Sequence, residues 1–426
     1  MRKILIKILK VLKWIGIVLL GIIIILLIVR LIGKMYYKRT PEGGINESMY
    51  LDVNGQEQWI SIYGENKDNP VMLFLHGGPG DSYSYADFLV LRKLAKDYTV
   101  VNWDQRNAGK TWLHDSQDRE ITPELMRSDL EVLTDKILEY TGKDKLTLLG
   151  MSWGTLYSDD FALRHPEKVE YVINLSVASH VGIYTEQMQQ DARDYCDGLL
   201  SYEEAISKYG YDFFCFADND KLGITEQADI TKLNDGIKQT YLIWTADDPE
   251  LHTLAEQYDP ELLTQVQLDP ENEELWVAYK ERNFPIDSKI CAKYGNQLHF
   301  EIQESVFDAD VGVIPSVWFN PYYTLPELCR ILTYDYDNNS YSNKIELLCE
   351  DFSQTLKGNL SYQMPFYVLQ GDHDDPLGVI RNYFDSITAP DKDFMYLEGG
   401  GHMSTLLRSE ELAAFVHGIA EKQRNS

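Results

Sequence analysis

The stretch LGMSWG, residues 149–154, places a serine between two glycines at the end of an apolar run. The preceding KLTLLG (145–150) has the pattern of a buried strand, and WGTLYSDDFALRHP, which follows, has that of a helix. A strand that turns at once into a helix needs residues without a Cβ atom on both sides of the turn. We therefore predict a sharp turn that exposes the hydroxyl of Ser152 at the edge of a sheet, as in a nucleophile elbow.

The segments around this turn alternate between strand and helix patterns. Asn54-Gly55 separates two alternating segments and predicts a hairpin. TPELMRSDLEVLTDKILEYTG predicts an amphipathic helix that begins near Pro123 and stops at Gly142. We expect further strands at 71–75, 98–103, 145–149 and 168–179. This order predicts an α/β fold with a mostly parallel, twisted sheet covered by helices on both faces.

The alternation stops at about residue 180 and returns at MPFYVLQGDHDDP (364–376), followed by DFMYLEGGGHM (393–403) and a closing helix. An insertion of this length between two strands of one sheet is most simply a helical cap. We therefore predict four segments: a membrane anchor at 1–40, the first part of the core at 41–179, the cap at 180–362 and the second part of the core at 363–426.

The first forty residues contain nine basic side chains and no acidic one. Residues 14–29 are all apolar or glycine, and with Arg30 reaching the interface the span extends through Leu31 and Ile32. Residues 3–13 carry lysines at helical spacing, which suits an amphipathic helix on the membrane surface. No small-residue cleavage site follows, so we expect an uncleaved transmembrane helix rather than a signal peptide. We expect the catalytic domain on the extracytoplasmic side, because the basic residues slightly favour a cytoplasmic N-terminus.

The remaining chain is strongly acidic. The formal charge of the whole sequence is −28, so residues 41–426 carry −37 once the nine anchor cations are set apart. Such a body is repelled by nucleic acid, and we expect no nucleic-acid partner. The five cysteines form no C-x-x-C motif, and no metal or cofactor motif occurs, so we expect no cofactor.

Candidate partners for Ser152 follow it in the order expected of a serine nucleophile. A serine hydroxyl needs an imidazole to accept its proton and a carboxylate to orient that imidazole. LQGDHDD supplies the acid as Asp372, Asp374 or Asp375, among which spacing does not decide. EGGGHMS supplies His402 in a glycine-rich loop after the last strand.

Two backbone N–H groups are also needed to stabilise the oxyanion that forms on attack. One is expected from Trp153, the residue after the nucleophile. The other is expected from HGGPG (76–80), the loop after the first parallel strand.

HGGPG, WDQRNAGKT and GMSWG, in this order and spacing, resemble the proline iminopeptidase family of α/β-hydrolases. The resemblance covers roughly 50–180 and 362–420 and implies an α/β-hydrolase fold with a serine peptidase activity that releases N-terminal residues. The family's G-x-x-D pattern falls on Gly371 to Asp374, which makes Asp374 the preferred acid, and its G-x-G-H pattern falls on His402. By the same resemblance Gly77 or Gly78, with Gly78 preferred, supplies the second oxyanion donor.

The D-Q-R of this family falls on Asp104, Gln105 and Arg106, which we interpret as scaffold for the floor of the site. Two positions depart from the family pattern, with Asn107 and Thr111 in place of Gly and Ser. The family holds the substrate's free amine through cap glutamates, and that motif does not align here. The acidic candidates in the cap are expected to be solvated surface: Glu203, Glu204, Glu281 and Glu301.

We predict a membrane-anchored serine hydrolase, an aminopeptidase that acts on short peptides. An esterase or lipase-like acyl hydrolase with the same triad, acting on lipids or small esters at the membrane, is the alternative. A non-catalytic receptor on a hydrolase fold is a third class. Epoxide hydrolase and haloalkane dehalogenase chemistry is disfavoured because those relatives use an aspartate where Ser152 stands.

Overall fold

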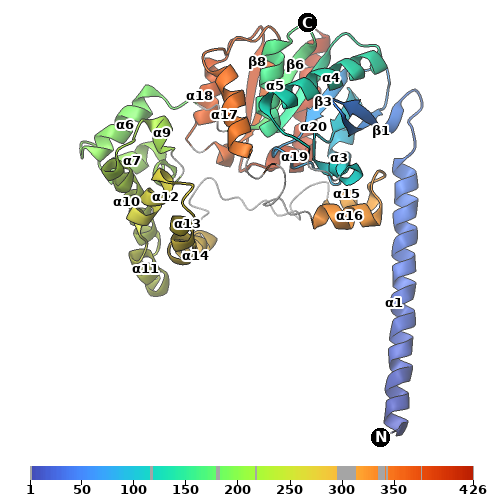
Figure 1. Ribbon diagram of the computed structural model, residues 1–426, viewed down its shortest axis with the longest axis horizontal. Coiled ribbons are helices and arrows are strands. Elements are labelled where there is room, and N and C mark those ends of the chain that lie inside the picture. Colours follow the sequence, from blue (N-terminus) through green and yellow to red (C-terminus); the bar gives the residue numbers. More distant parts are fainter. Residues whose placement is uncertain are drawn as a thin grey trace. The chain divides into compact units, whose positions relative to one another are not determined.

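The computed structural model describes residues 2–115, 119–178, 183–215, 218–294, 313–333, 341, 344–375 and 377–425 (Figure 1). The chain divides into two compact units. Unit 1 comprises 1–173, 305–352 and 406–426, and unit 2 comprises 174–304 and 353–405. Each unit is described by itself below.

The sheet has the order β1-β2-β4-β3-β5-β6-β7-β8. Unit 1 holds its first five strands in sequence: β1 (Ile45–Val53), β2 (Gln56–Gly64), β3 (Val71–Leu75), β4 (Thr99–Trp103) and β5 (Leu146–Ser152). β1 and β2 form the predicted antiparallel hairpin, in which Asn54 and Gly55 have φ angles of 48° and 78°. β3 runs parallel to both β4 and β5. β6 (Val169–Val177) crosses the boundary between the units, and β7 (Phe366–Gly371) pairs with β8 (Lys392–Leu397) in parallel within unit 2. The predicted α/β-hydrolase fold with a mostly parallel sheet is confirmed.

Local capping fixes both ends of α4 (Pro123–Thr141), the longest helix of unit 1 after α1. This helix begins as predicted, with the Thr122 side chain accepting from the Leu125 N–H, and ends at Gly142 in the left-handed conformation. α5 packs against β5 and β3. The other helices of the unit are α2 (Phe88–Lys93), α3 (Gly109–His114), α5 (Trp153–Arg164), α15 (Val313–Phe319), α16 (Leu325–Leu332) and α20 (Ser409–Arg424).

Unit 2 contains a helical cluster with its own apolar core. Buried residues of this core include Phe213, Tyr241 and Trp244. The helices of unit 2 are α6 (Glu186–Cys196), α7 (Tyr202–Tyr209), α8 (Asp212–Cys215), α9 (Asn219–Leu222), α10 (Gln227–Trp244), α11 (Pro249–Glu256), α12 (Pro260–Leu268), α13 (Glu273–Arg282), α14 (Phe284–Tyr294) and α18 (Val379–Ser386). α19 (Ser404–Leu407) crosses the unit boundary. α17 (Ile345–Leu356) crosses the unit boundary. The described part of 183–356 contains helices and connections without a strand, and the boundaries 180–362 for the cap stay a prediction.

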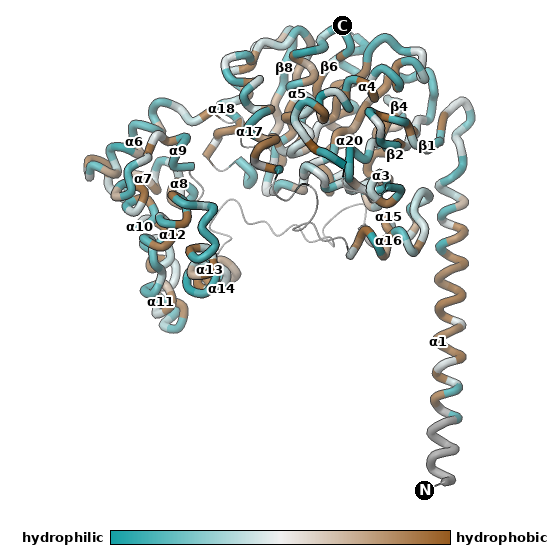
Figure 2. Tube along the Cα trace, viewed as in Figure 1, coloured by the Kyte–Doolittle hydropathy of each residue, from teal (hydrophilic) through white to brown (hydrophobic). Residues whose placement is uncertain are grey.

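The N-terminal segment forms one continuous helix, α1 (Arg2–Tyr37), which is long and apolar enough over Leu12–Tyr37 to cross a membrane. Figure 2 shows apolar residues along the middle part of this helix. The structure differs from the sequence expectation at Arg30, whose side chain is buried against protein carbonyl groups instead of reaching outward. The reason is a contact with Trp318 and Tyr323, which lie almost 300 positions later in the chain.

Candidate active site

Ser152 lies at the sharp turn predicted between β5 and α5. It is the last residue of β5, and its φ and ψ angles are 52° and −121°. A non-glycine residue with positive φ is uncommon and is typical of functional sites. Neither flanking glycine has room for a side chain. A Cβ on Gly150 would lie 2.5 Å from the Gly154 carbonyl oxygen, and a Cβ on Gly154 would lie 2.0 Å from the Leu75 carbonyl oxygen. The G-x-S-x-G spacing is therefore a steric requirement of this turn.

The HGGPG loop passes directly beside Ser152. A Cβ on Gly77 would lie 3.1 Å from the Cβ of Ser152. Gly78 has a φ angle of 110°, and a Cβ there would meet the Asp81 backbone nitrogen at 2.6 Å. Trp153 is the first residue of α5, where backbone N–H groups have no partner within the helix. The loop and the helix start, with the two predicted oxyanion donors Gly78 and Trp153, thus border the serine.

Gln105 ties this loop to the turn. Its side chain donates to the His76 carbonyl oxygen at 3.2 Å and accepts from the Trp153 indole N–H at 3.2 Å. Its backbone N–H donates to His76 Nε2 at 3.2 Å, while His76 Nδ1 lies 2.8 Å from the Gly77 carbonyl oxygen. Burial lowers the pKa of His76 to about 4, so the ring is neutral and carries its proton on Nδ1. His76 is structural in this arrangement.

Asp104 and Arg106 occupy buried polar sites below the loop. Asp104 accepts from Ser84 Oγ at 2.9 Å and from the Lys110 backbone N–H at 2.6 Å, and burial raises its pKa to about 6. Arg106 forms a bidentate pair with Asp129, at 2.7 and 2.8 Å. These contacts fit the scaffold role predicted for Asp104, Gln105 and Arg106.

His402 and Asp374 meet in unit 2. His402 Nδ1 lies 3.0 Å from Asp374 Oδ1 and 2.9 Å from Oδ2. The Asp374 side chain is 8% exposed and that of His402 is 41% exposed. The histidine loop is held by Ser176, whose hydroxyl donates to the His402 carbonyl oxygen at 2.6 Å. The imidazole is thus oriented by a carboxylate and remains accessible, as a general base requires.

The contacts of the other two aspartates separate them from Asp374. Asp372 accepts from the backbone N–H groups of Gly399 and Gly400, at 3.1 and 3.0 Å. Asp375 accepts from the Ile380 N–H at 2.9 Å at the start of α18 and from Tyr396 Oη at 2.7 Å, and burial raises its pKa. Of the three candidates, Asp374 is the one paired with the imidazole.

Gln370 is a site residue that the sequence analysis missed. It is fully buried at the end of β7, where its side chain donates to Asp374 Oδ2 at 2.8 Å and accepts from the Val177 N–H at 2.9 Å. The available signal was a lone polar residue in the apolar strand FYVLQG. A polar side chain in such a strand requires a buried partner.

The acidic cap candidates have the surface character that the sequence predicts. Glu203, Glu204 and Glu281 are exposed, and Glu204 serves as the N3 residue of a capping box with Ser201. Glu301 lies outside the described residues.

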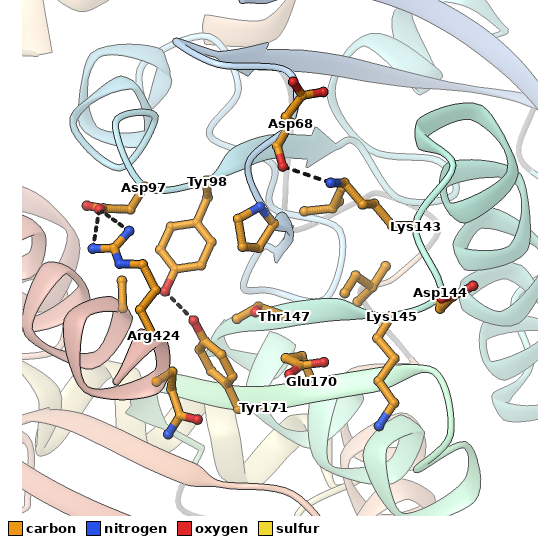
Figure 3. A pocket seen from close by; sticks show the side chains of 15 residues that line it. Asp68, Asp97, Tyr98, Lys143, Asp144, Lys145, Thr147, Glu170, Tyr171 and Arg424 are labelled. Atoms are coloured by element: carbon orange, nitrogen blue, oxygen red, sulfur yellow. Dashed lines mark hydrogen bonds and ion pairs between the residues drawn. The ribbon is translucent and has the colours of Figure 1, made fainter. Parts of the chain in front are cut away.

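Unit 1 contains a cavity of about 520 Å³ (Figure 3). It lies at the opposite end of the strands from Ser152. Its lining includes Val71 and Leu146, the first residues of β3 and β5, whereas Ser152 is the last residue of β5. The Tyr98 and Tyr171 hydroxyls hydrogen-bond within it, and Asp97 pairs with Arg424 at 3.0 Å. This cavity is separate from the candidate active site.

Comparisons with known proteins support the α/β-hydrolase fold. The model of the alpha/beta hydrolase fold family matches residues 70–195. A proline iminopeptidase of Lactobacillus helveticus is 32% identical over 142 residues, which cover 32% of this chain and 45% of that protein. A probable aminopeptidase of Bacillus subtilis is 31% identical over 117 residues, covering 28% of this chain and 37% of the relative. The matches thus span less than half the length of these relatives.

Two solved structures cover more of the chain at low similarity. A proline iminopeptidase-related protein from Thermus thermophilus has 17% identity and a TM-score of 0.41, with 88% of this chain and 96% of that chain covered. An epoxide hydrolase from Vigna radiata has 15% identity and a TM-score of 0.44, with 88% and 98% covered. At these scores neither structure informs on activity.

The fold and the family match define the chain as an α/β-hydrolase. Its matched core is similar to proline iminopeptidases and to a probable aminopeptidase, and it carries the motifs HGGPG, WDQRNAGKT and GMSWG.

Proposed function

We propose that this protein is a membrane-anchored serine hydrolase, an aminopeptidase that releases N-terminal residues from short peptides. The observation that carries the proposal is Ser152 itself, held with positive φ at a glycine-flanked turn beside the HGGPG loop. The hydrogen-bonded pair of His402 and Asp374 supplies the chemistry that such a serine needs. The aminopeptidase class follows from the relatives named above, and the anchor from the apolar helix α1.

In the proposed reaction the Ser152 hydroxyl attacks the carbonyl carbon of the first peptide bond, and His402 Nε2 takes its proton. Asp374 accepts from Nδ1–H and stabilises the imidazolium. The backbone N–H groups of Trp153 and Gly78 stabilise the oxyanion of the tetrahedral intermediate. The imidazolium then protonates the leaving amine as the C–N bond breaks, and an acyl-enzyme remains. Water, deprotonated by His402, releases the amino acid and restores Ser152.

The reaction is tested with the purified full chain in detergent. A fluorophosphonate probe is expected to label the wild-type protein and not the Ser152→Ala variant, and aminoacyl-arylamides are expected to be cleaved. Absence of labelling in correctly folded protein would instead favour the hypothesis of a non-catalytic receptor on a hydrolase fold.

The substrate class is tested separately. Prolyl and alanyl arylamides are compared with short-chain nitrophenyl esters, and we expect a higher kcat/KM for the arylamides. A preference for the esters, with no arylamide turnover, would assign the chain to acyl-ester hydrolysis. Electrostatic attraction of the substrate is tested by the salt dependence of kcat/KM. A protein of net charge −28 attracts a cationic amine, and salt screens this attraction. We therefore expect kcat/KM to fall as the ionic strength rises.

A further inference from the structure

The last two turns of α1 are built into unit 1. Arg30, Gly33, Lys34 and Tyr37 recur at helical spacing and so lie on one face of the helix. Arg30 is 4% exposed and donates to the carbonyl oxygens of Trp318 and, at 3.0 Å, Tyr323. The Lys34 ammonium donates to the same Tyr323 oxygen at 2.5 Å. Two cations of the helix are thus bound by backbone carbonyl groups at the end of α15 and in the segment that joins it to α16.

Close packing accompanies these hydrogen bonds. A Cβ on Gly33 would lie 2.1 Å from the Phe319 ring, so glycine permits the contact between α1 and α15. The Tyr37 ring packs edge-on against Phe88 at 5.2 Å, and its carbonyl oxygen accepts from Arg92 at 2.6 Å. The end of α1 is therefore a fixed part of unit 1 and not a loose tether.

The docking site lies on the sheet edge that carries Ser152. Tyr323, whose carbonyl binds α1, has its hydroxyl 2.6 Å from Ser84 Oγ, and Ser84 donates to Asp104. Asp104 directly follows the carboxyl end of β4, and Ser152 is the last residue at the carboxyl end of β5. Both strands run parallel to β3, so these two ends lie at the same edge of the sheet. α1 thus joins the unit at the edge of the nucleophile.

The length of the free apolar segment sets how close the membrane lies to this edge. Residues 14–29 are sixteen apolar or glycine residues, which span about 24 Å at 1.5 Å per residue. A hydrocarbon core is about 30 Å thick. Because the free segment is shorter than the core, the bilayer surface must reach the level of Arg30 and the segments that bind it.

The outward face of α16 suits contact with lipid. Leu325, Cys329 and Leu332, at positions i, i+4 and i+7, are exposed, with Leu325 and Leu332 at 37% and 59%, while Leu328 and Ile331 turn into the core. α15 contains no charged residue. The single acid of α16, Glu327, is paired with Lys110 at 2.6 Å. A face without an unpaired acid stands out in a chain of net charge −28.

We propose that the outward face of α16, formed by the stripe Leu325, Cys329 and Leu332, rests on the phospholipid surface beside α1. This inference rests on the proposed membrane anchoring and adds an orientation to it. The sheet edge with Ser152 faces the bilayer, and the cavity of Figure 3 faces away from it. Substrates then reach the serine from the membrane–water interface.

Fluorescence quenching in vesicles tests this orientation. The full chain is reconstituted in phosphatidylcholine vesicles containing lipids with a nitroxide at acyl position 5 or 12. An environment-sensitive maleimide dye is attached to Cys329, the exposed member of the five thiols. C329S gives the background, and two further single sites are introduced into it: Ile24→Cys in the span and Lys145→Cys, exposed at the start of β5.

We expect the dye at Cys329 to be quenched more by the position-5 nitroxide, that at residue 24 more by the position-12 nitroxide, and that at residue 145 by neither. Quenching at residue 24 without quenching at Cys329 would overturn the orientation and leave the anchor intact. No quenching at residue 24 would overturn both. A blue-shifted, unquenched dye at Cys329 would assign the face to a protein neighbour such as a second copy, and would also overturn the proposal.

Discussion

The two halves of the proposed catalytic machinery are held in place by different forces. The nucleophile half comprises Ser152 and the loop 76–80, and the acid–base half comprises Asp374 and His402. Ser152 is fixed by its own backbone, with a φ angle of 52° enforced by contacts that leave no room for a Cβ on Gly150 or Gly154. His402 is fixed through its side chain and carbonyl by hydrogen bonds to Asp374 and Ser176.

This difference predicts different sensitivities. A position fixed by close backbone contact tolerates loss of a functional atom but not added volume. A position fixed by hydrogen bonds tolerates similar volume but not a change in donors and acceptors. Substitutions of each kind in each half can confirm or break this contrast.

The largest expected effect is the loss of the nucleophile. Ser152→Ala removes only the reacting oxygen and is expected to lower kcat by about a million-fold, with little change in Tm, because the turn keeps its glycines. The control is Ser158→Ala, whose buried hydroxyl donates to the Thr155 carbonyl oxygen at 2.9 Å, one turn further into α5. That variant is expected to lose about 1 kcal/mol of stability and to keep its kcat. Substantial turnover by Ser152→Ala would remove Ser152 from the reaction.

The next effect concerns the acid. Asp374→Asn keeps the volume but removes the charge that orients the imidazole, and we expect kcat to fall by about 10⁴. Asp375→Asn is the matched control, since this neighbouring carboxylate binds the start of α18 and Tyr396 instead. It is expected to lower Tm and leave kcat nearly unchanged. Reversed results for the two variants would make Asp375 the catalytic acid.

A smaller effect is expected from volume added beside the nucleophile. In Gly154→Ala the new methyl group would lie 2.0 Å from the Leu75 carbonyl oxygen, and both partners are backbone, so strands or helix must shift. We expect a loss of about 3 kcal/mol in the free energy of unfolding, measured by urea denaturation. Gly418→Ala in α20 has open space at its Cβ and should instead gain about 0.5–1 kcal/mol. Equal stability of the two variants would show that the turn is not sterically fixed.

Features of the fold and of the candidate site differ in how far they can be predicted from the sequence. The turn at Ser152, the hairpin at Asn54-Gly55 and the helix Pro123–Thr141 follow from local patterns, because glycine, capping and apolar spacing act within a few residues. Spacing left three candidate aspartates; the family resemblance favoured Asp374, and the hydrogen bonds of each separate them in the structure. The docking of Arg30 at Tyr323 joins residues 293 positions apart, and no local pattern carries such a contact.

The buried glutamines give the finest test, because Gln105 contacts the nucleophile half and Gln370 contacts the acid–base half. Gln370→Leu removes a donor to Asp374 and leaves the Val177 N–H without its acceptor, while Gln105→Leu releases the Trp153 indole and the His76 carbonyl. We expect a 10- to 100-fold lower kcat/KM for each, about 1.4–2.7 kcal/mol at 25 °C. Only Gln370→Leu should also move the acidic limb of the profile of kcat/KM against pH to higher pH. Without the Gln370 donor, the Asp374 carboxylate interacts more strongly with the protonated imidazole of His402. If the limb shifts in neither variant, Gln370 acts on packing alone; if it shifts in both, the effect does not depend on the hydrogen bond to Asp374, and the two halves respond alike.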